Sequence, residues 1–253
     1  MGGPQAGGVR GLVSTATNDG IARILVVTAH PDDVDFGVAG SVATWTAAGI
    51  EVAYCVVTDG DAGGFDPDVP RADIAGIRRA EQLAAARVVG VEDVTFLGYP
   101  DGRLVSSIAL RRDISRVIRR FRPDRVVAQS PERNWERIYA SHPDHLAAGE
   151  ATVCAVYPDA RNPFAHPKLA AEGLDAHTVP ELWLMATRAR DVFVDVTDAF
   201  DKKVEALRCH VSQLVDADGG LETRIRGWLT ANATEAGLPE GRLAEAFQAV
   251  DTR

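Results

Sequence analysis

The chain has 253 residues, of which 46% are hydrophobic, 25% charged and 6% aromatic, which is an ordinary globular composition. It carries 27 Lys and Arg against 36 Asp and Glu, and this net charge of −9 argues against a protein that coats nucleic acid or an anionic membrane. No apolar run approaches the roughly 18 residues of a bilayer span, and three widely spaced cysteines, Cys55, Cys154 and Cys209, predict a reduced, cytoplasmic protein without a disulfide framework.

The N-terminal segment 1–20 is rich in glycine and lacks the apolar stretch of a secretory signal peptide. We therefore expect a flexible tail over 1–20. The rest of the chain, 21–253, contains no Pro/Ser-rich linker and no internal repeat, which predicts a single domain.

Strands and helices alternate through the first 160 residues. Short apolar runs predict strands at 24–29, 52–57, 94–97 and 125–129, and helical spacing predicts helices at 38–48, 74–89 and 108–121. Strand–helix–strand units of this kind build a parallel sheet with helices on both faces. The predicted fold class is therefore α/β and Rossmann-like, with a mostly parallel sheet. The arginines of the predicted helix 108–121, Arg119 among them, are expected on the solvated face of that helix.

The pattern is less regular beyond residue 160. We expect two more strands at 181–186 and 192–194, and two more helices at 200–214 and 222–233. These segments are interpreted as a C-terminal elaboration of the same domain.

Unusual polar residues gather in the loops that follow the predicted strands, where open α/β sheets bind their ligands. The first such cluster is His30-Pro31-Asp32-Asp33. An aspartate at the start of a helix is explained by capping. A histidine beside two adjacent carboxylates is not, because packed like charges cost stability unless a cation or a proton offsets them. We therefore predict metal chemistry here.

The second cluster, His142-Pro143-Asp144-His145, follows the strand at 125–129 and could by itself also be a helix cap. Together the two clusters supply His30, Asp33 and His145. Two histidines and one carboxylate, with a fourth position left for water, form the ligand set of a catalytic zinc site. Fe²⁺, Mn²⁺ and Co²⁺ accept similar ligands, and the sequence does not separate them.

These motifs resemble the LmbE-like, or PIG-L, family of N-acetylglucosaminyl deacetylases. The resemblance covers about residues 22–215, and its weaker blocks are Arg78–Glu81, Leu97–Gly102, Lys203–Leu207 and His210–Gln213. It departs from the family at Val34, where many members have Glu, and at Ala140, where some have Tyr. The resemblance implies a Rossmann-like fold, one zinc ion and hydrolysis of an N-acylated amino sugar to acetate and a free amine.

The resemblance also implies roles for individual residues. His30, Asp33 and His145 would hold the metal, Asp32 would act as general base, His142 would stabilise the developing oxyanion, and Asp144 would orient a histidine. Arg78 would contact substrate, and Asp101 could accept hydrogen bonds from sugar hydroxyls. For Arg78 and Asp101 the plain alternatives are a solvated helix charge and a turn residue.

The expected partner is a small N-acylated amino-sugar conjugate, with neither nucleic acid nor a membrane involved, and the oligomeric state stays open, a homo-oligomer included. Rival functions are an amidase acting on a glucosaminyl-inositol thiol conjugate, a metal-dependent phosphoesterase, and a sugar-binding module. The segments 130–141 and 160–180 are expected to decide the substrate. His210 and Gln213 are placed on the 200–214 helix, with packing at least as strong an explanation as a role in the site.

Overall fold

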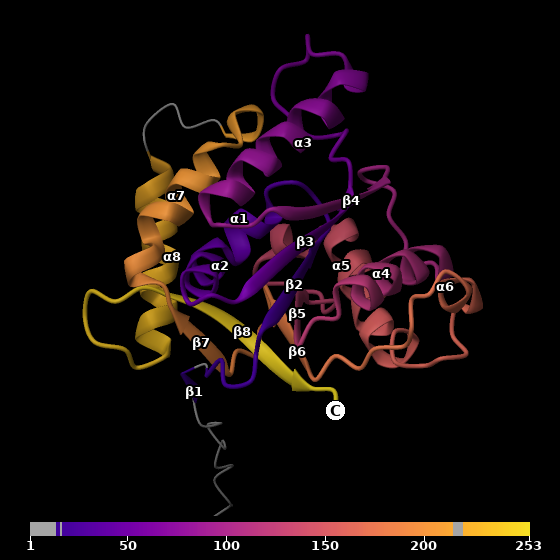
Figure 1. The fold of residues 1–253 in the computed structure, drawn as a ribbon. Coiled ribbons are helices and arrows are strands. Elements are labelled where there is room, and N and C mark those ends of the chain that lie inside the picture. The colour runs from indigo at the N-terminus through magenta and orange to yellow at the C-terminus, as the bar shows by residue number, and fades with distance from the viewer. Residues whose placement is uncertain (1–13, 16, 215–219) are drawn as a thin grey trace, which may run out of the picture.

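The computed structural model describes residues 14–15, 17–214 and 220–253 of the chain (Figure 1). Its strands form one sheet in the order β1-β7-β8-β6-β5-β2-β3-β4. The strands are β1 Ser14–Thr15, β2 Arg23–Thr28, β3 Glu51–Thr58, β4 Asp93–Tyr99, β5 Arg125–Gln129, β6 Glu181–Met185, β7 Val192–Asp195 and β8 Ala244–Asp251. Only β8 runs antiparallel to its neighbours, β6 and β7.

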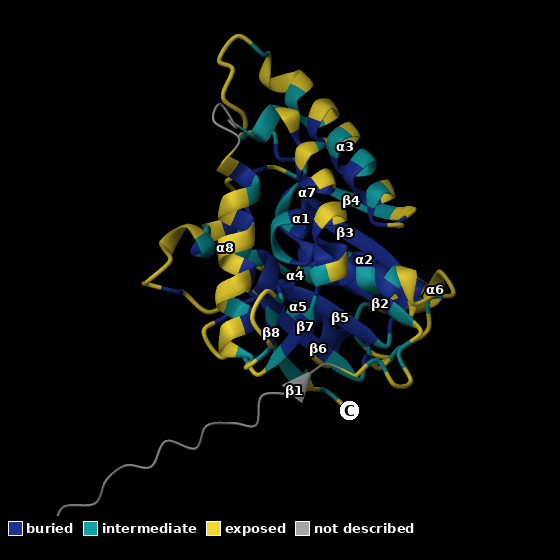
Figure 2. Cartoon of the chain, turned by 90° about the vertical axis from the view of Figure 1, so that its left-hand side faces the viewer, coloured by how far each residue is buried: buried dark blue, intermediate teal, exposed yellow. Residues whose placement is uncertain are grey.

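Helices cover both faces of this sheet, as the alternation of elements predicts. They are α1 Asp33–Gly37, α2 Ala39–Ala47, α3 Arg71–Val88, α4 Ile108–Phe121, α5 Pro143–Cys154, α6 Pro167–Ala171, α7 Phe200–Arg208 and α8 Gly220–Glu235. Successive residues of β2 point to opposite faces: Ile24 and Val26 pack with α2, α3, α7 and α8, whereas Leu25 and Val27 pack with α4 and α5. Figure 2 shows the result, buried strands between helices whose outer faces are exposed. The Rossmann-like α/β prediction is confirmed.

Several local predictions need correction. The helix expected over 200–214 ends at Arg208, and a separate 3-10 turn, Val211–Gln213, follows it. His210, which is fully buried, therefore lies between α7 and this turn and not on a helix. Strand β8 was not expected, and neither was α6 within 160–180.

Arg119 is also not on a solvated face. Only 2% of the residue is exposed, and its guanidinium donates hydrogen bonds to main-chain oxygens of Asp159, Ala160, Asn162, Ala165 and Leu174. It holds the irregular segment after α5 against α4.

Most of the segment predicted as a tail, residues 1–13 and 16, lies outside the described residues. Of the remainder, Ser14 and Thr15 pair with β7. Arg125 reaches back to Asn18 Oδ1 at 2.9 Å, so chain contacts with the domain begin before residue 21.

A buried ion pair joins the C-terminal elaboration to the first helices. Lys203 Nζ on α7 donates to Glu245 Oε1 on β8 at 2.8 Å and to the main-chain oxygens of Asp35 and Phe36, also at 2.8 Å. The Glu245 carboxylate in turn accepts the amides of Gly40 and Ser41 at the start of α2. A buried charge is tolerated only when paired and hydrogen-bonded in this way. The pair fixes the segment that follows the first His/Asp motif.

Candidate active site

The two His/Asp motifs meet where the order of the strands reverses. The chain proceeds from β2 outward to β3 and β4 and then returns to β5 on the other side of β2. His30 follows β2, and the segment 142–145 follows β5 and opens α5. Because β2 and β5 are parallel neighbours, with Val27 opposite Ala128, their carboxyl ends lie together. This is the position at which open α/β sheets form ligand sites.

The three predicted metal ligands converge at this point. His30 Nδ1 lies 3.2 Å from His145 Nε2 and 3.4 Å from Asp33 Oδ2, and Asp33 Oδ1 lies 3.1 Å from His145 Nε2. Zinc–ligand distances of about 2.0–2.2 Å put donor atoms of a tetrahedral site about 3.3–3.6 Å apart. The spacing of the two histidine nitrogens is close to that requirement, and each oxygen of Asp33 lies at a similar distance from one of them.

The second nitrogen of His30 faces two further carboxylates. Its Nε2 lies 3.0 Å from Asp101 Oδ1 and 3.2 Å from Asp144 Oδ2. Asp144 is fully buried and also accepts the amides of Gly102 at 2.7 Å and Leu104 at 3.1 Å. A carboxylate behind a ligating histidine fixes the tautomer and orientation of the ring. Asp144 contacts a proposed ligand in this way, and its orienting role stays a prediction.

This cluster carries more negative charge than its histidines balance. Burial disfavours a charged imidazole, but hydrogen bonds to Asp101, Asp144 and Asp33 outweigh it and raise the pKa of His30 to about 12. Such a site holds a positive charge strongly.

Asp32 is held in an uncommon backbone conformation next to this cluster. Its φ of +99° is one that side-chain-bearing residues rarely adopt, and such strain gathers at functional sites. The Asp32 amide donates to Gln82 Oε1 at 2.8 Å, and its carboxylate lies 3.4 Å from Arg78 Nη2. Burial and the neighbouring Asp33 raise the pKa of Asp32 to about 7, with Arg78 acting in the opposite direction.

A buried chain of polar side chains supports Asp32, and most of it is not predicted from the sequence. Gln82 Nε2 donates to Asp35 Oδ2 at 3.0 Å, and His210 Nε2 lies 2.7 Å from the same oxygen. None of these three side chains is exposed. The signal available in the sequence was a glutamine four residues after Arg78, on the same face of a helix.

His142 is oriented by its own helix. The amide of Asp144 donates to His142 Nδ1 at 3.2 Å, so Nδ1 is the acceptor and Nε2 carries the proton of the neutral ring. Burial and the nearby His30 and His145 lower the pKa of His142. Its ring centroid lies 5.0 Å from that of His30 and 5.3 Å from that of His145. A neutral N–H donor therefore stands beside the proposed ligands.

Arg78 and Asp101 face the protein more than they face solvent. The Arg78 guanidinium is 4% exposed and donates to Pro31 O at 2.5 Å and to Gly60 O at 3.0 Å. The glycine-rich loop closes over it, because a Cβ at Gly60 or Gly63 would clash with the guanidinium. Asp101 is turned toward His30. Substrate contact by Arg78 and Asp101 stays a prediction, and this geometry favours positioning roles for both.

A cavity of about 480 Å³ opens beside Asp33 and His145 and extends to α8. Arg137 and Tyr139, from the predicted specificity segment 130–141, line it. Its far wall comes from α8 and its surroundings, including Trp228, Asn232 and Arg190. The segment 160–180 contributes no residue to it. The contribution of α8 was not expected from the sequence.

Comparisons with known proteins identify the family of this chain. The profile of the PIG-L family, described as GlcNAc-PI de-N-acetylase, matches residues 25–156. Diacetylchitobiose deacetylase of Thermococcus kodakarensis is 33% identical over 193 residues, which cover 76% of this chain and 70% of the relative. Probable N-acetyl-alpha-D-glucosaminyl L-malate deacetylase 2 of Bacillus anthracis is 30% identical, covering 76% of this chain and 81% of the relative.

A solved structure of a deacetylase has the same fold as this chain. The N,N'-diacetylchitobiose deacetylase of Pyrococcus horikoshii, complexed with its inhibitor MPG, superposes with a TM-score of 0.85 at 29% identity, covering 93% of this chain and 86% of that one. Among the described residues, no helix has the length and apolar character needed to cross a membrane. By its profile match and its relatives, the chain belongs to the PIG-L family.

Proposed function

We propose that this protein is a metal-dependent N-deacetylase of N-acetylglucosaminyl conjugates, which it hydrolyses to acetate and a free amine. The observation that carries the proposal is the convergence of His30, Asp33 and His145, of which Asp33 and His145 line the cavity. Both curated relatives described above are named as deacetylases, and an N-acetylglucosaminyl unit is common to their named substrates.

The metal ligands in this proposal are His30 through Nδ1, Asp33 and His145 through Nε2. A divalent ion held there supplies Lewis-acid chemistry, lowering the pKa of water and polarising the amide carbonyl. Zinc is the metal we propose, and Fe²⁺, Mn²⁺ and Co²⁺ suit the same nitrogen and oxygen donors. Asp101 and Asp144 hold the His30 ring from behind.

Asp32 is the proposed general base. It takes the proton of the attacking water and later gives it to the leaving amine, a role that requires a side chain able to hold and release a proton near neutral pH. Gln82 accepts a hydrogen bond from the main-chain amide of Asp32, and Arg78 pairs with its carboxylate. His142 donates from Nε2 to the carbonyl oxygen as negative charge develops there. We also propose a cytoplasmic location, which is supported by the absence of a disulfide at Cys55, Cys154 and Cys209.

The test combines metal analysis with turnover. Purified protein is loaded with Zn²⁺ and assayed for acetate and primary amine with N-acetylglucosaminyl conjugates that carry sugar, inositol and malate aglycones. His145→Ala and Asp33→Ala should lose both metal and activity. His177→Ala is the matched control, because His177 lies outside the cluster and bonds to Pro123 O. If metal-loaded protein released neither acetate nor amine from any conjugate, the proposed function would be overturned. Full metal content in His145→Ala would show that His145 is not a metal ligand.

A further inference from the structure

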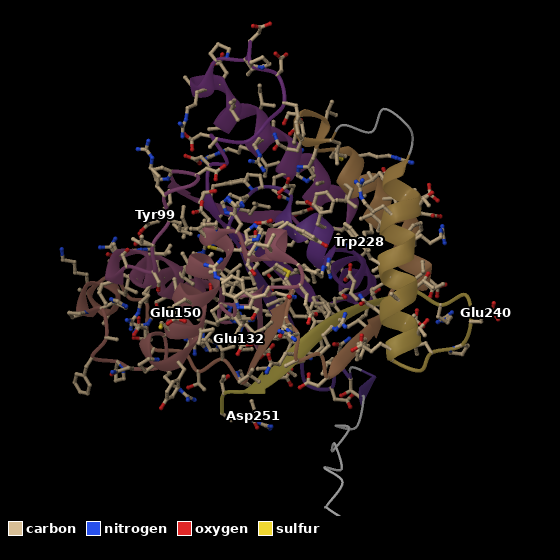
Figure 3. All side chains as sticks on the ribbon, turned by 180° about the vertical axis from the view of Figure 1, so that it is seen from behind. Tyr99, Glu132, Glu150, Trp228, Glu240 and Asp251 are labelled. Atoms are coloured by element: carbon tan, nitrogen blue, oxygen red, sulfur yellow. The ribbon has the colours of Figure 1, made fainter. Side chains whose placement is uncertain are left out.

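The lining of the cavity contains an arginine that lies near two aromatic rings. Arg137 Cζ lies 5.3 Å from the centroid of the Tyr139 ring and 5.9 Å from that of Trp228. Its Nε donates to Tyr139 Oη at 2.8 Å. Tyr139 lies in the 3-10 helix Ile138–Ser141, between β5 and α5. Trp228 lies on α8 (Figure 3). The two segments thus meet across the cavity at a cation.

The charge of Arg137 is not neutralised by the protein. Among the residues that the structure describes, no carboxylate pairs with it, although the chain as a whole carries a net charge of −9. Its neighbours differ: Arg190, on the same cavity, pairs with Glu235 at 2.7 Å, and Arg188 pairs with Glu136 at 3.1 Å. The Trp228 ring also has a second cation beside it, because Arg224 Cζ lies 5.9 Å from its centroid.

The lining of the cavity therefore joins groups of different character. It contains Asp33 and His145 of the proposed metal site and also the unpaired guanidinium of Arg137 with its aromatic neighbours. A volume of about 480 Å³ falls within the usual range for small-molecule sites. Because these groups line one cavity, an amino sugar with its amide at the proposed metal site can place its aglycone at Arg137.

We propose that the preferred substrate is an N-acetylglucosaminyl conjugate whose aglycone carries a carboxylate, and that Arg137 binds this carboxylate. The inference rests on the proposed function and adds the chemical class of the aglycone. A guanidinium binds a carboxylate through two parallel hydrogen bonds, and the bond from Arg137 Nε to Tyr139 Oη restricts its orientation while leaving the terminal nitrogens free. Arg137 is thus a specificity-determining residue and not one of the proposed catalytic groups.

The experiment uses two glycosides of the same anomer that differ in one group, 4-carboxyphenyl and 4-carbamoylphenyl N-acetylglucosaminide. The kcat/KM for amine release is measured with Zn²⁺-loaded enzyme. The carboxylate should be preferred by about tenfold or more, mainly through KM, and this preference should fall as ionic strength rises. In Arg137→Gln the ratio should drop to near one. Arg188→Gln, which alters an exposed arginine already paired with Glu136, should keep the wild-type ratio.

A second pair of variants tests the aromatic wall. Trp228→Ala should raise KM for both glycosides, whereas Trp135→Ala, which removes a 74% exposed tryptophan outside the cavity, should not. A wild-type ratio near one, or a ratio retained in Arg137→Gln, overturns the inference. So does turnover of neither glycoside while another conjugate is deacetylated. Failure to deacetylate any conjugate overturns the proposed function itself.

Discussion

The amide of Asp32 donates a hydrogen bond to Gln82 Oε1 at 2.8 Å, and this contact holds Asp32 at a φ of +99°. The other end of the Gln82 amide donates to Asp35, which is also bonded to His210. The position of the proposed base therefore depends on a side chain from α3 and on His210, which lies 178 residues after Asp32 in the chain.

Gln82→Met tests this dependence. The substitution removes both hydrogen bonds at similar volume, so the strained Asp32 should relax and kcat should fall by about 10- to 100-fold, as for other residues that orient an active site. Metal content should stay at the wild-type level because no proposed ligand is altered. Activity and bound zinc are measured on the same preparation. Wild-type kcat in this variant would show that Gln82 does not position the base.

Asp32→Asn tests the base itself. An amide cannot take a proton from water, so kcat should fall by about 10²- to 10⁴-fold while zinc binding persists. Asp175→Asn, at an exposed carboxylate outside the cluster, should have no effect. Activity within a few-fold of wild type in Asp32→Asn would exclude the proposed role.

Much of the fold follows from local patterns. The runs at 24–29, 52–57 and 125–129 are largely apolar on both faces because each strand is buried between two helix layers. Continuous apolar runs of this kind can be recognised directly in a sequence. Strand β8 escaped notice because it is alternating and rich in alanine, AEAFQAVD, and it gains its identity only by pairing with β6 and β7. Arg119 was misread because its partners are main-chain oxygens of a distant loop, which no sequence pattern reveals.

The candidate site divides in the same way. The members of the two compact motifs, such as His30 and His145, could be proposed from the sequence because their spacing is itself the signal. Gln82, Asp35 and the wall formed by α8 could not, because their roles arise from tertiary contacts between segments far apart in the chain. Arg78 was recognised, but its burial beneath the glycine-rich loop was not foreseen.

Metal removal should destabilise the protein. An ion that binds only the folded state adds RT ln(1 + [L]/Kd), about 2.7 kcal/mol at a hundredfold excess over Kd. For a chain of this size, that corresponds to a fall in Tm of about 5–10 °C on chelation. Thermal melts with and without Zn²⁺ measure the shift, and His145→Ala should show none. An equal Zn²⁺-dependent shift in His145→Ala would locate the ion elsewhere.

Lys203→Met should be strongly destabilising, although Lys203 takes no part in the chemistry. Both members of its pair with Glu245 are at most 2% exposed, so the substitution leaves a buried carboxylate without its cation. Breaking such a pair costs about 3–5 kcal/mol in the free energy of unfolding, measured by urea denaturation. The double variant Lys203→Met/Glu245→Gln should recover part of this loss, because it removes the uncompensated charge. Arg226→Met, which breaks the exposed pair with Glu222, should cost less than about 1 kcal/mol. A loss in Lys203→Met as small as in Arg226→Met would show that this buried pair does not fasten the C-terminal elaboration to α1 and α2.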